Sequence, residues 1–226
     1  MTSILLIRHG ENDFVGKRLA GHLPGVHLNE KGRKQAELLA AALKNAPVKA
    51  IYSSPLERAV ETAQPLAAAL NLPVNLHPGL TELNFGTWQG KTTRQMHRMK
   101  AWKTIMEKAS EMRFPQGESY VEAQARMVSA VEEIKAASDK NALVACFSHS
   151  DSIRLVLAHY LDMPLDEFHR LNIDTASISL LYLGEGRPTL GIMNFLIGLE
   201  WKFPEPPKKS KKKTGPPEEK GAETND

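Results

Sequence analysis

The most informative stretch of the chain is Ile4-Leu5-Leu6-Ile7-Arg8-His9-Gly10-Glu11. Its four consecutive apolar residues predict a short strand that is buried on both faces. Arg8 and His9 follow at the carboxyl end of this strand, where open α/β sheets bind their ligands. A guanidinium matches phosphate oxygens, and an imidazole can act as a nucleophile or base near neutral pH. Gly10 has no Cβ and is expected to let the backbone approach a ligand closely. The alternative interpretation is a strand that ends in an ordinary surface turn.

The composition is that of an ordinary globular protein. Of the 226 residues, 42% are hydrophobic and 24% are charged, which predicts one folded domain with a substantial core. The apolar runs are too short to cross a bilayer, and no signal sequence precedes the first strand, so we expect a cytoplasmic protein without membrane association. The single cysteine, Cys146, excludes an internal disulfide and a cysteine-based metal site. Its apolar neighbours predict a small core residue.

Residues 204–226 differ in composition from the folded domain expected at residues 1–203. They are rich in Pro, Lys and Glu, which predicts a disordered tail. Of the 29 basic and 26 acidic residues, the tail holds six lysines and five acids, which leaves 23 and 21 in the domain. This near neutrality argues against a nucleic-acid-binding face on the domain. The lysine run at 208–213 is either a solvated linker or a site for nucleic acid or an anionic surface.

Apolar runs and helical periodicities alternate along the domain. Strands are expected at residues 4–7, 48–52, 72–76, 142–147, 176–183 and 189–195, and helices at 29–44, from 55 onward, at 96–112, 119–137 and 152–161. Alternating strands and helices predict a three-layer α/β/α sandwich with a mostly parallel sheet.

Local signals mark the starts of two helices. Ser54-Pro55-Leu56-Glu57 has the pattern of a capping box with proline at the first helical position, and Ser119 and Glu122 form a second box. Pro65 predicts a kink or a split in the first of these helices. In the helix expected at 96–112, Met99, Trp102, Ile105 and Met106 recur at core spacing.

Four residues at the ends of three predicted strands are expected to converge. Arg8 and His9 follow the first strand, Arg58 begins a helix after the second, and His149 follows the strand at 142–147. The carboxyl ends of parallel strands meet along one edge of a sheet, so these side chains can form a phosphate pocket. Taken alone, Arg58 is equally consistent with a surface residue paired with a neighbouring glutamate.

These motifs resemble those of the histidine phosphatase superfamily, which includes the cofactor-dependent phosphoglycerate mutases. The resemblance covers about residues 3–195 and is carried by Arg8-His9-Gly10-Glu11, Ser53-Ser54-Pro55-Leu56-Glu57-Arg58-Ala59 with Thr62-Ala63, the segment 80–90 around Glu82, and Ser148-His149 with Ile153-Arg154. It implies the phosphoglycerate mutase-like fold and a catalytic domain at residues 1–203.

The resemblance also implies a role for each central residue. His9 is expected to take the phosphoryl group and become phosphohistidine. Arg8, Arg58 and His149 are expected to hold the phosphate oxygens, and Glu82 to act as the general acid. Two guanidinium groups can supply the positive charge that phosphoryl transfer requires, so no metal and no cofactor are expected. The neutral His9 ring needs its other N–H held, and a backbone carbonyl is the expected acceptor.

Two positions depart from the family pattern. Val15 stands where an asparagine that contacts the phosphate is common, and Ser150 stands where glycine is frequent. Lys17 or Arg18 can compensate for the first change. The residues expected to bind substrate are Arg8, Asn12, Lys17, Arg18, Gly21, His22, Arg58 and Ser150. Together with Arg94, Arg98 and Lys100, the two basic residues at 17 and 18 suggest a second anionic group on the substrate.

The favoured function is hydrolysis of a phosphomonoester of a small metabolite. A phosphoglycerate mutase is the first alternative, and the short segment between Glu82 and Gly117 favours hydrolysis because family mutases carry a longer insertion there. A non-catalytic phospholigand-binding protein is the second alternative, and the presence of both His9 and Glu82 argues against it. The sequence leaves a monomer and a homodimer both open.

Overall fold

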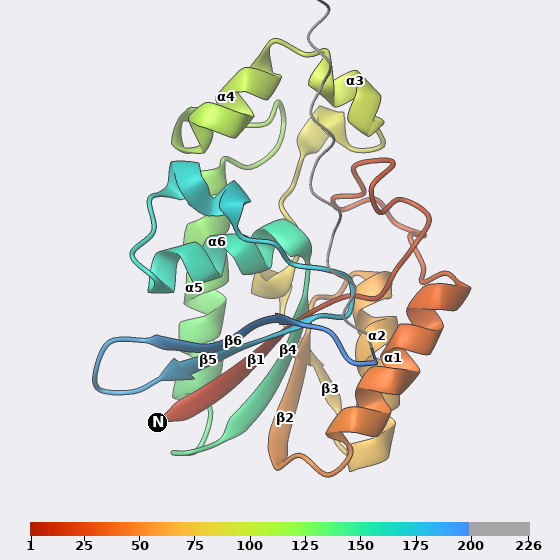
Figure 1. Cartoon of the computed structure of the whole chain (residues 1–226), viewed down its shortest axis with the longest axis vertical. Helices are drawn as coiled ribbons and strands as arrows, with labels where there is room; N and C mark the ends of the chain where they lie inside the picture. The colour runs from red at the N-terminus through yellow and green to blue at the C-terminus, as the bar shows by residue number, and fades with distance from the viewer. Residues whose placement is uncertain (199–226) are drawn as a thin grey trace, which may run out of the picture.

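The strand predicted from the first apolar run lies inside a six-stranded sheet. In the computed structural model, which describes residues 1–198, this strand is β1 (Thr2–Arg8). The sheet order is β3-β2-β4-β1-β5-β6 (Figure 1). The other strands are β2 (Val48–Ser53), β3 (Val74–Leu76), β4 (Leu143–Ser148), β5 (Ile178–Leu183) and β6 (Thr189–Phe195). The β3–β2, β2–β4 and β4–β1 pairs are parallel, whereas β1–β5 and β5–β6 are antiparallel, so the sheet is mostly parallel as predicted.

Helices cover both faces of the sheet and bury it completely around β1. The helices α1 (Glu30–Leu43) and α2 (Glu57–Leu70) lie on one face, and α5 (Tyr120–Ala136) and α6 (Ser150–Tyr160) lie on the other (Figure 1). Along β1, Leu5 and Ile7 pack into the core beneath α1 and α2, while Ile4 and Leu6 pack into the core beneath α5 and α6. This two-sided burial explains why the strand is apolar at consecutive positions.

Side chains cap α1 and α5 but not α2. The side chain of Asn29 accepts a hydrogen bond from the backbone nitrogen of Gly32 at the start of α1. Ser119 and Glu122 form the predicted capping box of α5. The box predicted at Ser54 is wrong, because α2 begins only at Glu57 and no side chain caps it. Pro65 lies inside α2, which is one helix from residue 57 to 70, so the predicted split does not occur.

The single helix expected at residues 96–112 is also wrong. This region forms α3 (Thr93–His97), α4 (Ala101–Glu107) and a 3-10 turn, η3 (Ala109–Glu111). A capping box between Thr92 and Gln95 starts α3 earlier than predicted. The break lets Ile105 reach the core, but Met106, which was expected there, is 45% exposed. In Figure 1, α3 and α4 stand beyond the sheet, at the end where β1 and β4 terminate.

Three further 3-10 turns complete the described chain: η1 (Pro78–Leu80), η2 (Gly86–Trp88) and η4 (Leu165–Arg170). Cys146 is fully buried on β4, as predicted. Within residues 1–198 no helix is both long enough and apolar enough to cross a membrane. The tail predicted at 204–226 lies outside the described residues, as do residues 199–203 of the predicted domain.

Candidate active site

Four segments that are far apart in the sequence meet at one edge of the sheet. They are the end of β1 with Arg8 and His9, the first turn of α2 with Arg58, the loop after η1 with Glu82, and the junction of β4 and α6 with His149. The first four of these side chains line a pocket of about 160 Å³. The structure therefore brings together the residues that the sequence pattern singled out.

The ring of His9 is fixed by a backbone carbonyl. Its Nδ1 lies 2.7 Å from the carbonyl oxygen of Gly10. A carbonyl only accepts hydrogen bonds, so Nδ1 carries the hydrogen and Nε2 of the neutral ring keeps its lone pair. Burial, and then the charges of Arg58 and Arg8, hold the pKa of His9 well below its ordinary value, against the opposing effect of the Gly10 carbonyl. The ring of His9 is thus neutral and oriented, with Nε2 free of a proton.

The two arginines line the pocket, and each has buried N–H groups. Nη1 of Arg8 donates to the carbonyl of Ile173 at 2.7 Å, and Nη2 of Arg58 donates to the carbonyl of Gly21 at 2.8 Å. Nε of Arg8 and both Nε and Nη1 of Arg58 are buried and have no hydrogen-bond partner among residues 1–198. Burial lowers the pKa of Arg58 to about 10, so the group is still charged at neutral pH. Buried donors without partners are costly, and a phosphate anion would satisfy them.

Gly10 serves the packing of α1 rather than the approach of a ligand, which corrects the expectation from the sequence. A Cβ at this position would lie 2.7 Å from the carbonyl oxygen of Gly32 in the first turn of α1. The backbone nitrogen of Gly10 donates to Oγ1 of Thr62, whose hydroxyl donates to the carbonyl of Arg58. Thr62 therefore connects the segment that carries His9 to the helix that carries Arg58.

His149 lies beside His9, with the ring centroids 5.2 Å apart. Its side chain is fully buried, and its Nε2 is 2.8 Å from Oγ of Ser54. Nδ1 is buried without a partner in the described part of the chain. Burial and then Arg58 hold the pKa of His149 well below its ordinary value, so this ring is neutral as well.

The carboxyl group of Glu82 is held through one of its two oxygens. Oε1 accepts from the backbone nitrogen of Leu83 at 3.0 Å and lies 3.2 Å from Oγ of Ser152. Burial, and then the charge of Asp151, raise the pKa of Glu82, although the Leu83 N–H and the two arginines oppose the shift. Because Oε1 is engaged, Oε2 is the oxygen that can exchange a proton with a group in the pocket.

Comparison with known proteins identifies the family. The histidine phosphatase superfamily (branch 1) matches residues 4–195. The chain belongs to this superfamily. Phosphoserine phosphatase 1 of Hydrogenobacter thermophilus is 29% identical over 201 residues, which cover 88% of this chain and 95% of the relative. The 2,3-bisphosphoglycerate-dependent phosphoglycerate mutase of Thermoplasma acidophilum is 32% identical over 196 residues, with 86% and 94% covered.

Solved structures agree with this assignment. Phosphoserine phosphatase from Entamoeba histolytica, in complex with 3-phosphoglyceric acid, has a TM-score of 0.76 at 28% identity and covers 86% of this chain and 98% of its own. The expected phosphoglycerate mutase-like fold is confirmed by such likenesses.

The residues expected to bind substrate in this superfamily member divide into two groups. Asn12, Arg18, Gly21 and Ser150 line the pocket with the central residues. Lys17 is exposed and does not line it. His22 does not line it either. Its Nε2 donates to the carbonyl of Glu82 at 2.5 Å. Val15, which stands where asparagine is common in the family, is part of the apolar wall of the pocket, together with Phe14 and Phe85.

Sequence reasoning missed several groups that position the site. Ser54 was assigned to a helix cap but hydrogen bonds to His149, and Ser152 was assigned to the start of a helix but contacts Glu82. Arg126 was placed only within a helix, although it contacts the Glu82 loop. No local pattern indicates these contacts, since each joins residues more than 40 positions apart. Among residues 1–198, no group of three or more His, Cys, Asp or Glu side chains is arranged to bind a metal.

Proposed function

We propose that the protein hydrolyses phosphomonoesters of small metabolites through a phosphohistidine at His9. The observation that carries this proposal is the 2.7 Å contact between Nδ1 of His9 and the carbonyl of Gly10, which leaves Nε2 unprotonated beside unpaired guanidinium N–H groups. A neutral imidazole nitrogen next to an anion-binding pocket is suited to attack a phosphorus atom.

The reaction proceeds in two displacements. Nε2 of His9 attacks phosphorus, the bond from phosphorus to the ester oxygen breaks, and Oε2 of Glu82 gives its proton to the departing oxygen. The Glu82 carboxylate then takes a proton from water as that water attacks the phosphohistidine. Inorganic phosphate leaves, and both side chains return to their starting protonation states.

Positive charge for both steps comes from the arginines in this proposal, which makes the enzyme independent of metals. Arg8 and Arg58 approach the pocket from different elements, so their N–H groups can hold different phosphate oxygens. Such preorganised donors typically stabilise a transition state by about 3 kcal/mol each. His149 is proposed to donate a further hydrogen bond from Nδ1, which is buried and without a partner in the described residues.

The pocket favours a small substrate. Its volume of about 160 Å³ holds a phosphate group and only a few further atoms, and its apolar walls come from Phe14, Val15 and Phe85. The similar proteins named above act, according to their names, on phosphoserine and phosphoglycerate. We propose a substrate of that size, and Arg18 in the wall of the pocket is the one basic residue of the suggested second anion site that lies there.

A phosphoglycerate mutase is the second candidate, because a mutase is 32% identical to this chain. The two functions differ in the fate of the phosphoryl group. Incubation with 3-phosphoglycerate and catalytic 2,3-bisphosphoglycerate should release phosphate and form little 2-phosphoglycerate. Rapid isomerisation with negligible phosphate release would favour the mutase.

The nucleophile is tested directly by trapping. Mixing the enzyme with a ³²P-labelled monoester and quenching in alkali should leave label on the wild-type protein and none on His9→Ala. The variant should also lose hydrolysis almost completely. A variant that retains the parental rate would rule out the proposed mechanism. Cytoplasmic location and a homodimer also stay predictions, to be tested by cell fractionation and by light scattering.

A further inference from the structure

The general acid sits on a segment that has no regular structure of its own. Residues 81–85 connect η1 to η2, and Glu82 lies in this loop. A catalytic carboxyl group must be placed within a fraction of an ångström of the leaving oxygen, so something outside the loop must fix it.

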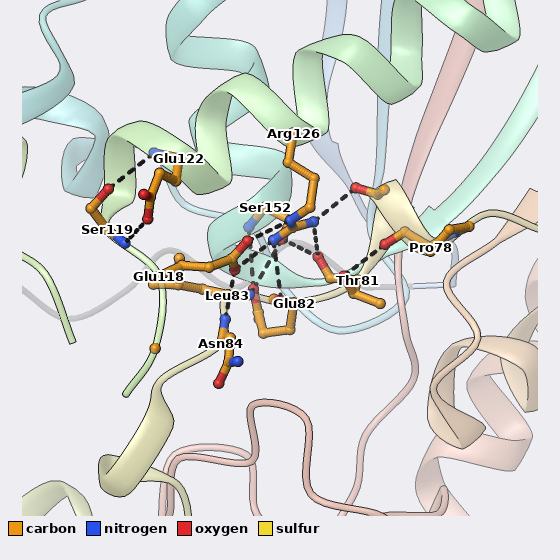
Figure 2. Close-up of polar contacts among 12 residues, drawn as sticks. Pro78, Thr81, Glu82, Leu83, Asn84, Glu118, Ser119, Glu122, Arg126 and Ser152 are labelled. Carbon is orange, nitrogen blue, oxygen red and sulfur yellow. Dashed lines mark hydrogen bonds and ion pairs between the residues drawn. The ribbon is translucent and has the colours of Figure 1, made fainter. Parts of the chain in front are cut away.

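Arg126 of α5 holds this loop through its backbone (Figure 2). Its Nη1 donates to the carbonyls of Gly79 at 2.8 Å and Thr81 at 3.0 Å, and its Nη2 donates to the carbonyl of Glu82 at 3.3 Å. The guanidinium thus contacts the loop just before the acid and at the acid itself.

The other N–H groups of Arg126 bind Glu118. Nε lies 2.7 Å from Oε1 and Nη2 lies 2.9 Å from Oε2 of that carboxylate. Oε2 also accepts from the backbone nitrogen of Asn84 at 2.8 Å, on the far side of the acid. Burial opposes ionisation of Glu118, but the Arg126 and Asn84 donors hold its pKa below the ordinary value. Arg126 and Glu118 therefore bind the loop backbone both before and after Glu82.

All five N–H groups of Arg126 are used in these contacts. A guanidinium has five donors in a fixed plane, whereas a lysine ammonium has three donors and no fork. Within residues 79–82, the one carbonyl that Arg126 does not contact is that of Leu80, which accepts from Oγ of Ser148. Each carbonyl from residue 79 to 82 is thus held by a side chain from outside the loop.

We propose that Arg126, together with Glu118, is the positioning residue for the general acid, acting on Glu82 through the loop backbone. This inference rests on the proposed function, in which Glu82 protonates the leaving oxygen. Arg126 touches neither the pocket nor the reacting atoms. Its loss should therefore impair proton donation and leave phosphate binding in place.

Two substrates separate these effects. An alkyl phosphate such as phosphoserine needs a proton on its leaving oxygen, whereas p-nitrophenyl phosphate releases a stable anion and needs little help. In Arg126→Lys, the single-turnover rate of leaving-group release should fall about 10-fold or more for phosphoserine and by less than about 3-fold for p-nitrophenyl phosphate. This rate excludes the later hydrolysis of the phosphohistidine, in which Glu82 serves both substrates alike. KM should change little for either substrate.

A matched control is available in the same region. Arg113 also forms an ion pair with a glutamate, Glu122 near the start of α5, but both side chains are more than 45% exposed and neither contacts the Glu82 loop. Arg113→Lys should leave kcat for both substrates unchanged. Glu118→Gln is a milder second variant, because its amide oxygen can still accept from Asn84, and it should show the same preference in weaker form.

Glu82→Gln distinguishes failure of this inference from failure of the proposed function. If Glu82→Gln slows release of the leaving group equally from both substrates in a single turnover, the assignment of the acid is wrong, because that measurement excludes the later hydrolysis of the phosphohistidine. If Glu82→Gln slows phosphoserine selectively but folded Arg126→Lys and Glu118→Gln slow both substrates equally or neither, the positioning role is wrong. Should Arg126→Lys fail to fold, Glu118→Gln decides the question by the same comparison of the rates for phosphoserine and p-nitrophenyl phosphate.

Discussion

Oε1 of Glu82 lies 3.3 Å from the backbone nitrogen of Ser152, in the first turn of α6. The carboxyl group therefore faces a helix N-terminus, which favours its ionised form. Burial and the nearby carboxylate of Asp151 act in the opposite direction, and their effect dominates, so the pKa of Glu82 is raised. The protonation of the acid is a balance between these neighbours, and the balance can be shifted by mutation.

The pH dependence of kcat should report this balance. For an alkyl phosphate, kcat should fall on the alkaline side as Glu82 loses its proton. Asp151→Asn removes a negative charge that raises the pKa of Glu82, so the alkaline limb should move to lower pH. Asp139→Asn, at an exposed position, serves as the control. A limb that stays in place or moves to higher pH would contradict the role of Asp151.

The buried charge of Arg58 should raise activity and lower the stability of the fold. Its side chain is 1% exposed and its pKa is lowered to about 10 by burial, so its charge is costly to hold in the fold. Arg58→Met should reduce kcat/KM about 100-fold, consistent with the loss of roughly 3 kcal/mol of transition-state stabilisation. The melting temperature should not fall.

The matched control for this experiment is Arg170→Met, which removes an arginine that is 73% exposed. It should change neither activity nor melting temperature. A drop of many degrees in the Arg58 variant would mean that this guanidinium is needed for folding.

Gly10→Ala should destabilise the protein. The added Cβ would lie 2.7 Å from the backbone oxygen of Gly32, and neither backbone can move freely between β1 and α1. A loss of about 2 kcal/mol in the free energy of unfolding is expected, measured by urea titration. Gly186→Ala is the control, since a Cβ there has no atom within 4 Å. Equal stability of the two variants would refute the close contact.

The free energy of unfolding should decrease as the pH falls below about 6.5. His9 and His149 are buried with pKa values held well below the ordinary one. In the unfolded chain they take up protons near pH 6.5, so acid favours unfolding by up to about 1.4 kcal/mol per group per pH unit. Urea titrations at pH 7 and 5.5 should show a smaller pH effect in His9→Asn than in His159→Asn, which changes an exposed histidine. Equal pH effects would contradict this prediction.

Chelation should leave turnover unchanged. In the proposed mechanism, Arg8 and Arg58 supply the positive charge around the phosphate. Phosphate release from phosphoserine should proceed at the same rate before and after dialysis against EDTA. Loss of activity that returns with one divalent metal would show that arginine charge is insufficient.

Most of the site could be predicted because its residues lie at strand ends. Arg8 and His9 directly follow β1, and His149 directly follows β4, so parallel pairing alone brings them together. The cap at Ser119 was predictable for a similar reason, since both of its hydrogen bonds join residues three apart. Such signals are contained in a few consecutive residues.

The contacts that failed prediction depend on distant partners. Ser54 has the local pattern of a cap, but its hydroxyl is bound by His149, 95 residues away, and Leu56 is extended instead of helical. The position of Glu82 depends on Arg126, 44 residues away, which looks like an ordinary polar residue on a helix. Only the folded structure shows these partners, which are distant in the sequence.

The placement of Cys146 has a practical consequence. Burial in β4 raises the pKa of its thiol to about 12, so it stays protonated and shielded from alkylating reagents. Since the chain has no other cysteine, a thiol introduced on the exposed side of α4 would be the sole target for a maleimide fluorophore. The enzyme thus offers a ready background for attaching one reporter dye to α4.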